Sequence, residues 1–306
     1  MIGRTASFVV TLGAAALGTL SAAKAQSPIE TFHVQGNVYM LVGAGPNVAV
    51  QIGDEGVLVV DTGTRASREQ LLAAIRGLSD KPIRWIINTS SDADHTGGNE
   101  TISQAGQTVN GNPAAIIAHE NVLARMTAEN RPVTELPLNT FFEDGRDFSF
   151  NGEAVFLYHV PSAHTDGDIV VYFRGSDVLV AGDVFVTTSY PVIRGDAGGG
   201  IDGFVAGLDK MLDIAVPKYL QEGGTYVIPG HGRIGDEADL LEFRDMAVIL
   251  RDRIASLVDQ GMTLEQIMAT KPTLDYDLRY ATSAWTPAMF AAAVYRNLQQ
   301  QKKGAR

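Results

Sequence analysis

One short polar segment combines two carboxylates and an imidazole, a set of groups that binds metals and moves protons. The segment Asn88–Asn99 holds Asp92, Asp94 and His95 ahead of a pair of glycines. It follows the apolar run Pro82–Ile87, which is typical of a buried strand, so the three side chains are expected on a loop at a strand end. Carboxylate and imidazole are ligands of divalent metals. Taken alone, the pattern fits a metal-binding loop and an ordinary Asp-rich turn about equally well.

The same arrangement recurs at three later positions. His164 follows the apolar run Ala154–Val160, Asp183 closes the run Val-Leu-Val-Ala-Gly-Asp, and His231 closes Tyr-Val-Ile-Pro-Gly-His. In each case a metal-ligand residue type stands at the carboxyl end of a predicted strand, beside Gly or Pro. Because neighbouring strand ends converge at one edge of a sheet, we expect these side chains to meet.

In these segments the chain resembles the metallo-β-lactamase superfamily. The motifs that carry the resemblance are Val-Leu-Val-Val-Asp-Thr-Gly at 57–63, Asp-His-Thr-Gly-Gly-Asn at 94–99, His-Thr-Asp-Gly-Asp at 164–168, Ala-Gly-Asp at 181–183 and Pro-Gly-His-Gly at 229–232. They span about residues 30–235, in the family's order. The resemblance implies an α/β fold of the four-layer αββα sandwich type, with a metal site at one edge.

The metal loop departs from the family's usual pattern, His-x-His-x-Asp-His. Ser90 and Asp92 stand where the first two histidines belong, and these normally bind the first metal together with the later histidine, here His164. A neutral serine hydroxyl is a poor ligand, whereas Asp92 is a plausible oxygen ligand. The second-site ligands that the resemblance implies are all present: Asp94, His95, Asp183 and His231. We therefore expect one divalent ion there, Zn²⁺ with Mn²⁺ or Fe²⁺ as alternatives, and leave open a second ion held by Asp92, His164 and Asp183.

Hydrolysis is the chemistry that this ligand set indicates. A bound metal lowers the pKa of water to about 7, and the hydroxide attacks a carbonyl. The resemblance suggests a lactam, lactone, ester or thioester of a small-molecule substrate. The expected catalytic residues are Asp94 at the metal, with Asp92 or His164 as general base if the first site is empty. In the Gly-rich segment Ser189–Gly203, which either lines the pocket mouth or merely connects two elements, Tyr190 and Arg194 are the candidates for substrate contact.

Two other functions fit the same residues. The replaced ligands are consistent with a catalytically degenerate periplasmic binding protein of the same fold. A di-iron oxidoreductase is a third hypothesis, which needs a complete first site, and no flavin-binding region is visible in the sequence. The formal net charge of −11 argues against nucleic acid as a partner. Oligomeric state stays open.

The first 25 residues resemble a secretory signal. Arg4 precedes the apolar run Phe8–Leu20, and Ala23-Lys24-Ala25 forms a small-x-small cleavage site. The alternative, a membrane anchor, is disfavoured because the run is shorter than the roughly 20 residues that span a bilayer. We expect cleavage after Ala25, no membrane anchor afterwards, and a periplasmic or secreted protein. The absence of cysteine suits such a compartment and leaves histidine and carboxylate as the metal ligands.

The remaining periodicity predicts a sandwich over residues 26–235 and a C-terminal helical extension over 236–306 packed on it. Phe32–Val42 and Asn47–Ile52 read as two strands, and Phe141–Phe150 as irregular or edge structure. Asp61 closes an apolar run; it is either the N-cap of the next helix or, as the resemblance implies, a support behind the metal loop.

Overall fold

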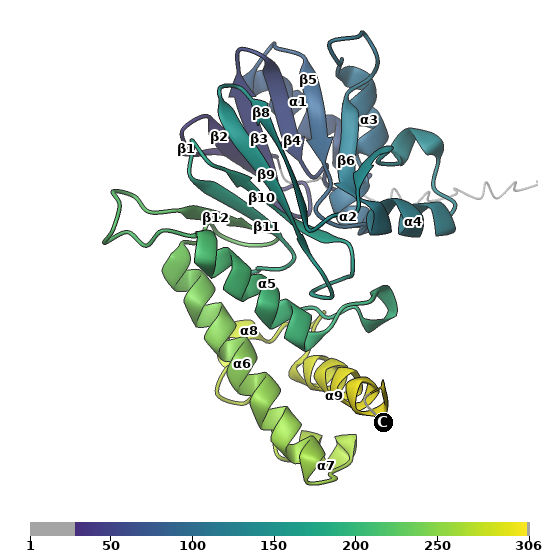
Figure 1. Ribbon diagram of the computed structural model, residues 1–306, viewed down its shortest axis with the longest axis vertical. Coiled ribbons are helices and arrows are strands. Elements are labelled where there is room, and N and C mark those ends of the chain that lie inside the picture. Colours follow the sequence, from purple (N-terminus) through teal and green to yellow (C-terminus); the bar gives the residue numbers. More distant parts are fainter. Residues whose placement is uncertain (1–27, 305–306) are drawn as a thin grey trace, which may run out of the picture.

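Two β-sheets pack face to face between two outer layers of helices (Figure 1). The structure, a computed structural model, describes residues 28–304, so the expected signal segment and its cleavage site at Ala25 lie outside the described residues. The prediction of a four-layer αββα sandwich with C-terminal helices is confirmed. Among the helices within 28–304, none combines the length and apolarity needed to cross a membrane.

The first sheet runs in chain order through β1 (Glu30–Gln35), β2 (Val38–Val42), β3 (Val48–Gly53), β4 (Gly56–Val60), β5 (Ile83–Ile87), β6 (Ala115–His119) and β7 (Asn139–Phe141). The first four strands pair antiparallel, and β4 to β7 pair parallel. The expectation of one strand over Phe32–Val42 is wrong. Gly36 takes a positive φ of 57° and turns the chain there, so the stretch is a hairpin.

The second sheet has the order β12 (Tyr226–Pro229), β11 (Val178–Gly182), β10 (Asp168–Phe173), β9 (Glu153–Val160) and β8 (Gly145–Phe150). Only β11 and β12 pair parallel within it. The expectation of edge structure over Phe141–Phe150 is confirmed, because β7 ends the first sheet at Phe141 and β8 is an edge strand of the second sheet, paired only with β9. Asn151 and Gly152 both have positive φ, which is the geometry of a tight hairpin turn.

The inner faces of the two sheets form one apolar core, which includes Leu58, Ile87, Val171 and Ile228. Every residue of β4 is buried, because its other face is covered by α1 (Arg68–Leu78). The helices α1, α3 (Asn99–Ala105) and α4 (Glu120–Ala128) form the outer layer on this sheet (Figure 1).

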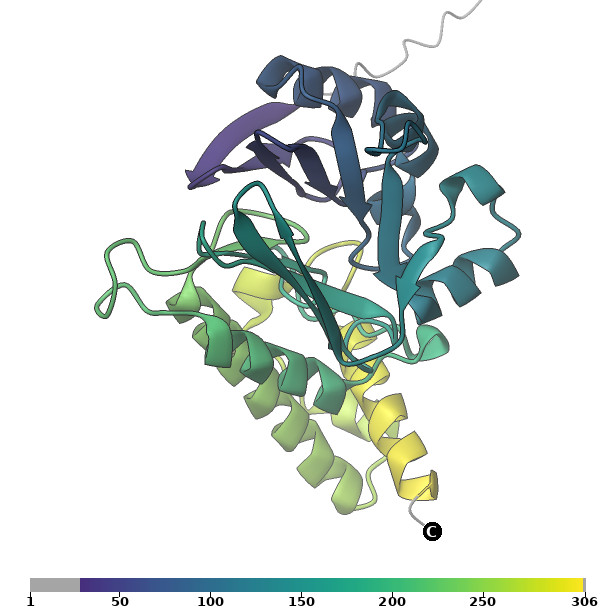
Figure 2. The same ribbon diagram turned by 45° about the horizontal axis from the view of Figure 1, so that its top comes forward.

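The second sheet is covered by α5 (Ile201–Ile214) and by the C-terminal helices (Figure 2). These are α6 (Glu237–Asp259), α7 (Leu264–Ala269), α8 (Asp277–Tyr280) and α9 (Pro287–Gly304). Helix α6 packs against α5 and α9, and Phe204, Phe243 and Phe290 are buried between these elements. Thr263 and Gln266 form a capping box at the start of α7.

Candidate metal centre

Strand direction brings the predicted ligands to one edge of the sandwich. In the second sheet β9 and β11 run the same way, since both are antiparallel to β10, and β12 is parallel to β11. His164, Asp183 and His231 each follow one of these strands. In the first sheet, β5 leads into the short helix α2 (Ala93–Thr96), which carries Asp94 and His95 directly after Asp92. The ligand residues therefore meet where the two sheets face each other.

Two groups of side chains converge there. In the first, Asp94, His95 and His231 each offer one atom, and these atoms lie within 4.8 Å of one another. In the second, the same holds for Asp92, His164 and Asp183. All six sequence-predicted metal ligands are thus brought together.

Asp183 connects the two groups. Its Oδ2 atom lies 3.4 Å from His95 Nε2 and 3.9 Å from His164 Nε2, and its Oδ1 atom lies 3.7 Å from His231 Nε2. Three histidines therefore surround one largely buried carboxylate. This arrangement is suited to a ligand shared by, or placed between, two cation positions.

Unpaired buried atoms show that the residues fit a cation. His95 Nε2 and Asp183 Oδ1 are buried and, among the described residues, have no hydrogen-bond partner. A buried polar atom left in this state costs about 1–3 kcal/mol, and a shared divalent ion removes that cost by coordination. Gly230 leaves the space for Asp183, because a Cβ atom at position 230 would lie 2.2 Å from Asp183 Oδ1. The donor set, imidazole with carboxylate, is one that zinc, iron and manganese accept.

Asp61 supports His95 from behind. Its Oδ2 atom accepts a hydrogen bond from His95 Nδ1 at 2.7 Å, and both its oxygens accept from Thr89. This bond places the proton of the imidazole on Nδ1 and leaves Nε2 free as a ligand. The N-cap alternative for Asp61 is wrong, because the residue at the start of α1 is Ser67.

Asp168 has the corresponding place behind His164. Its Oδ1 atom lies 3.5 Å from His164 Nδ1, which is an ion-pair distance, while both carboxylate oxygens accept hydrogen bonds from Thr165 at 2.6 Å. Sequence reasoning gave Asp168 no role. The signal was available in the His-Thr-Asp-Gly-Asp motif, where the last aspartate stands four residues after the histidine.

The surrounding carboxylates hold protons on the buried histidines. Burial alone would lower the pKa of His95, but the charges of Asp183 and Asp61 outweigh it and raise that pKa well above its usual value. Burial would also lower the pKa of His164, but the carboxylates of Asp168, Asp183 and Asp92 outweigh it and raise that pKa to about 9. Burial would raise the pKa of Asp183, but the positive charges of the neighbouring imidazolium groups outweigh it, so that pKa is lowered. The centre thus attracts positive charge, as protons or as metal.

One side of the centre is open to solvent. The side chain of His231 is 34% exposed and that of Asp94 is 40% exposed, whereas His95 and His164 are almost fully buried. His231 Nε2 lies 3.5 Å from Asp94 Oδ2 and is the main cause of the lowered pKa of Asp94. The centre is therefore accessible to solvent from the Asp94 and His231 side.

Tyr190 does not lie at this opening, so the expectation that it contacts substrate is wrong. Its side chain is fully buried in the core under the C-terminal helices, where it stacks on Phe290. Its hydroxyl group donates to the carbonyl of Thr273 and to Asp277. Tyr190 is a core residue because α8 and α9 pack over its ring. No local pattern in the sequence indicates this burial.

Arg194 does lie at the centre, where it contacts a predicted ligand. Its guanidinium group donates to Asp92 Oδ1 at 2.8 Å and to Asp196 Oδ2 at 3.3 Å. The Oγ atom of Ser90 accepts from the backbone N–H of Asp92, and Ser90 is buried.

Sequence reasoning missed Arg131. It donates to the carbonyl of Ser91 at 3.0 Å and to the hydroxyl of Thr96 at 2.6 Å, and so ties both ends of the ligand loop together. No local motif marks this arginine, which follows a helix far along the chain. His119 and His159 take structural roles: His119 caps α4, and His159 forms a hydrogen bond with the carbonyl of Asp166.

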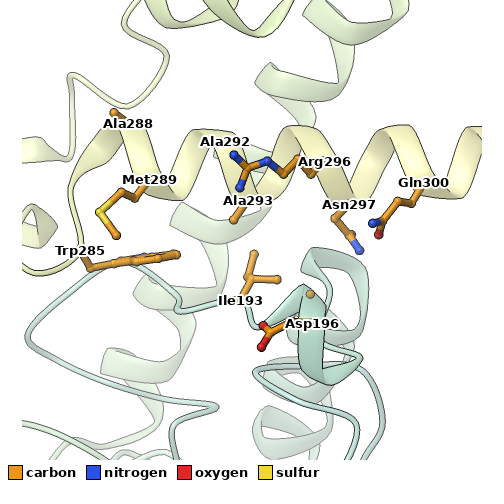
Figure 3. A pocket seen from close by; sticks show the side chains of 11 residues that line it. Ile193, Asp196, Trp285, Ala288, Met289, Ala292, Ala293, Arg296, Asn297 and Gln300 are labelled. Carbon is orange, nitrogen blue, oxygen red and sulfur yellow. The ribbon is translucent and has the colours of Figure 1, made fainter.

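A cavity of about 580 Å³ lies between α9 and the segment that carries Arg194 (Figure 3). Ile193 and Asp196 line it from this segment, and Trp285, Met289 and Arg296 line it from the C-terminal region. None of the described residues lining it belongs to the two ligand groups. The cavity is therefore adjacent to Arg194 in the chain but separate from the metal ligands.

Comparison with known proteins identifies the family. The family model described as the metallo-beta-lactamase superfamily matches residues 34–231. The chain belongs to this superfamily. The match ends at His231, so it includes every predicted ligand, and the resemblance read from the motifs is confirmed.

Relatives within the superfamily carry two kinds of hydrolase name. The linear primary-alkylsulfatase of Pseudomonas sp. (strain ATCC 19151) is 26% identical over 259 residues, which cover 70% of this chain and 47% of that protein. The chain thus spans about half the length of this relative. The metallo-beta-lactamase type 2 of Bacillus cereus is 23% identical over 193 residues, which cover 63% of this chain and 69% of that protein.

Solved structures show the same fold. The sec-alkylsulfatase Pisa1 from Pseudomonas sp. superposes with a TM-score of 0.68 at 18% identity, covering 88% of this chain and 50% of that one. The DIM-1 metallo-beta-lactamase superposes with a TM-score of 0.58 at 19% identity, covering 72% of this chain and 98% of that one. The sulfatase match covers 88% of the chain, which is more than residues 1–235 contain. It therefore includes part of the C-terminal helices.

Proposed function

We propose that this protein is a metal-dependent hydrolase that cleaves a lactam, lactone, ester or thioester of a small molecule. The observation that carries the proposal is the buried Asp183 carboxylate, whose oxygens lie within 3.9 Å of the Nε2 atoms of three histidines, His95, His164 and His231. The ion is proposed to be Zn²⁺, held by Asp94, His95, Asp183 and His231. When bound, it acidifies water and polarises the scissile group.

The chain's own residues orient the reactants around this position. Asp61 fixes the His95 ring, and Asp168 faces the outer nitrogen of His164. Asp94 and His231 form the solvent-open side, where the substrate enters. Asp92 and Asp94 are the carboxylates placed to accept a proton from the attacking water, and the protonated His164 ring stabilises the charge of Asp92, with Nε2 3.5 Å from Asp92 Oδ2.

A sulfate ester is the second candidate substrate. It is favoured by the alkylsulfatase likeness, which extends into the C-terminal helices whereas the DIM-1 likeness covers a smaller share of the chain. Both reactions add water across the bond that is cleaved, at a carbonyl carbon in one case and in a sulfate ester in the other, and the metal centre would serve either. The substrates differ in the reacting atom, so a direct comparison separates them.

The test combines metal content with a substrate panel. Purified protein is expected to retain about one divalent ion per chain. It should hydrolyse at least one member of a panel of chromogenic lactams, lactones, carboxylic esters, thioesters and alkyl sulfates supplied with Zn²⁺, Mn²⁺ or Fe²⁺. Asp183→Ala and His231→Ala should lose both the ion and the activity. A protein that binds no ion and cleaves nothing contradicts the proposal; one that binds ions and panel compounds without turnover supports the degenerate binding protein instead.

Export is a separate proposal, based on the signal-like N-terminal segment. We propose that cleavage after Ala25 releases the protein to the periplasm or the medium. Cell fractionation, with N-terminal sequencing of the product, tests this, and recovery of uncleaved protein in the cytoplasm contradicts it.

A further inference from the structure

The guanidinium group of Arg194 stands beside the ligand set where the family's first metal is bound. It donates to Asp92 Oδ1 at 2.8 Å, while the other oxygen of Asp92 faces His164 Nε2 at 3.5 Å. The Arg194 side chain is 37% exposed and that of Asp92 only 16%, so the contact closes over the carboxylate from the solvent side. One oxygen of Asp92, the carboxylate that stands in place of a lost histidine, is therefore already paired with a cation.

The backbone around Arg194 is built to hold it there. Its N–H group donates to the carbonyl of His164 at 2.9 Å, and its own carbonyl accepts from Ala197 and Gly199. A Cβ atom at position 199 would lie 2.1 Å from the carbonyl oxygen of His164. Glycine is thus required for this close approach, and the Gly-rich segment is a fitted support for Arg194 and not a loose connector.

A second arginine fixes the following turn. Arg125 donates to Asp166 Oδ1 at 2.7 Å and to the carbonyl of Ala197 at 3.0 Å. The turn after Arg194 is therefore tied both to α4 and to the loop that carries His164. The backbone that carries the guanidinium group is therefore held by several hydrogen bonds along the segment, in addition to the ion pair with Asp92.

The other first-site residues do not replace the missing ligands. Ser90 is buried and its Oγ atom accepts the N–H of Asp92. That leaves His164 Nε2 and one oxygen each of Asp92 and Asp183 facing the position, with a fixed positive charge at its edge. A divalent ion added there meets repulsion from Arg194 and from any ion already bound by Asp94, His95 and His231.

We propose that Arg194 serves as a built-in cation that substitutes for the first metal and keeps this centre mononuclear. This inference rests on the proposed function, since it assumes that one ion is bound at the second site. In this role Arg194 is a positioning residue: it occupies Oδ1 of Asp92 and reserves Asp183 for a single ion. Removing its charge opens the Asp92, His164 and Asp183 set to a second ion.

Metal stoichiometry tests this without relying on activity. The full chain is stripped with a chelator, titrated with Zn²⁺ by calorimetry, and analysed for bound zinc after gel filtration. We expect one tight ion for the wild type and two for Arg194→Ala and Arg194→Gln. The second ion should bind about 10- to 100-fold more tightly in these variants than in the wild type, the range found for groups beside metal ligands. Arg194→Lys keeps the charge and should remain at one ion.

Two further variants make the result specific. The double variant R194A with Asp92→Asn should return to one ion, because the newly available ligand is lost. Arg251→Ala removes an arginine on α6 that pairs with Asp202 and Asp252, away from the centre, and should leave the stoichiometry unchanged. Two tight ions in the wild type, or an unchanged single ion in both R194A and R194Q, would overturn the role of Arg194 while leaving the metallo-hydrolase proposal intact. No bound ion in the wild type would contradict the proposed function itself.

Discussion

The Oδ2 atom of Asp61 lies 2.7 Å from Nδ1 of His95, although the two residues stand 34 positions apart in the chain. Asp61 directly follows β4 in the left-handed region, with φ of 63°, and its carboxylate lies behind the ligand loop, bonded to Thr89 and His95. The contact selects the imidazole tautomer whose Nε2 atom faces Asp183. Asp61, which is not itself a predicted ligand, thus orients the ligand His95.

Replacing Asp61 should therefore weaken metal binding without removing a ligand. Asp61→Asn keeps the size of the side chain but loses the charge, and we expect about 10- to 100-fold lower zinc affinity by calorimetry. Asp61→Ala leaves Thr89 and His95 without their buried acceptor and should also lower the free energy of unfolding by about 1–3 kcal/mol. Asp54→Asn, at a fully exposed position, is the control. Equal zinc affinity in Asp61→Asn and Asp54→Asn would show that Asp61 does not set the tautomer.

Gly230 should be needed for the metal centre because of the space it leaves. A Cβ atom there would lie 2.2 Å from Asp183 Oδ1 and 2.8 Å from the backbone of Gly182. Gly230→Ala is expected to displace Asp183 and to lower zinc affinity at least about tenfold. Gly77→Ala is the matched control: it meets no atom within 4 Å in α1 and should stabilise the fold by about 0.5–1 kcal/mol. Calorimetry and thermal denaturation of both variants check this, and unchanged zinc binding in Gly230→Ala would contradict the steric argument.

Stability of the metal-free protein should fall as the pH rises. The pKa of His164 is raised to about 9 in the folded protein, against about 6.5 in an unfolded chain. Its contribution to stability is therefore fully present below about pH 6.5 and is lost as the pH rises through about 9. Denaturation of the metal-free protein between pH 6 and pH 9 measures this slope. The variant His164→Gln should flatten it, and an equal slope in that variant would exclude His164 as its source.

Added zinc should reverse this dependence. Metal ligands must be deprotonated, so protons compete with zinc for His95, whose pKa is raised well above its usual value. The rise in melting temperature caused by one equivalent of Zn²⁺ is expected to be larger at pH 8 than at pH 6. A stabilisation that is independent of pH would indicate that zinc binds away from His95.

Tyr190 should matter for stability and not for substrate. Its hydroxyl group bonds Thr273 and Asp277 inside the C-terminal core. Tyr190→Phe removes these bonds and is expected to lower the free energy of unfolding by about 0.5–2 kcal/mol, with KM unchanged. Arg194→Gln, which alters the edge of the metal centre, is the comparison for kinetics. A raised KM with unchanged stability in Tyr190→Phe would return Tyr190 to the substrate site.

Sequence alone determined which residues stand at the metal centre. Asp94, His95, Asp183 and His231 each follow an apolar run, and the direction of strands in a sheet brings such ends to one edge. The same motifs also predicted the family and the layered fold, because each motif is a local pattern of an apolar strand followed by glycine and a metal-ligand residue. Periodicity also indicated the helical extension at the C-terminal end, where Thr263 and Gln266 form a capping box.

The tertiary structure alone decided what each neighbouring side chain does. Arg194 meets Asp92 across 102 residues of chain, and Tyr190, four residues earlier, turns into the core under the C-terminal helices. Both residues lie in the same Gly-rich segment, so no local pattern distinguishes them. Arg194 reaches the metal centre and Tyr190 enters the core because of how the second sheet and the C-terminal helices pack against that segment. Contacts between distant segments are set by such packing and not by local sequence.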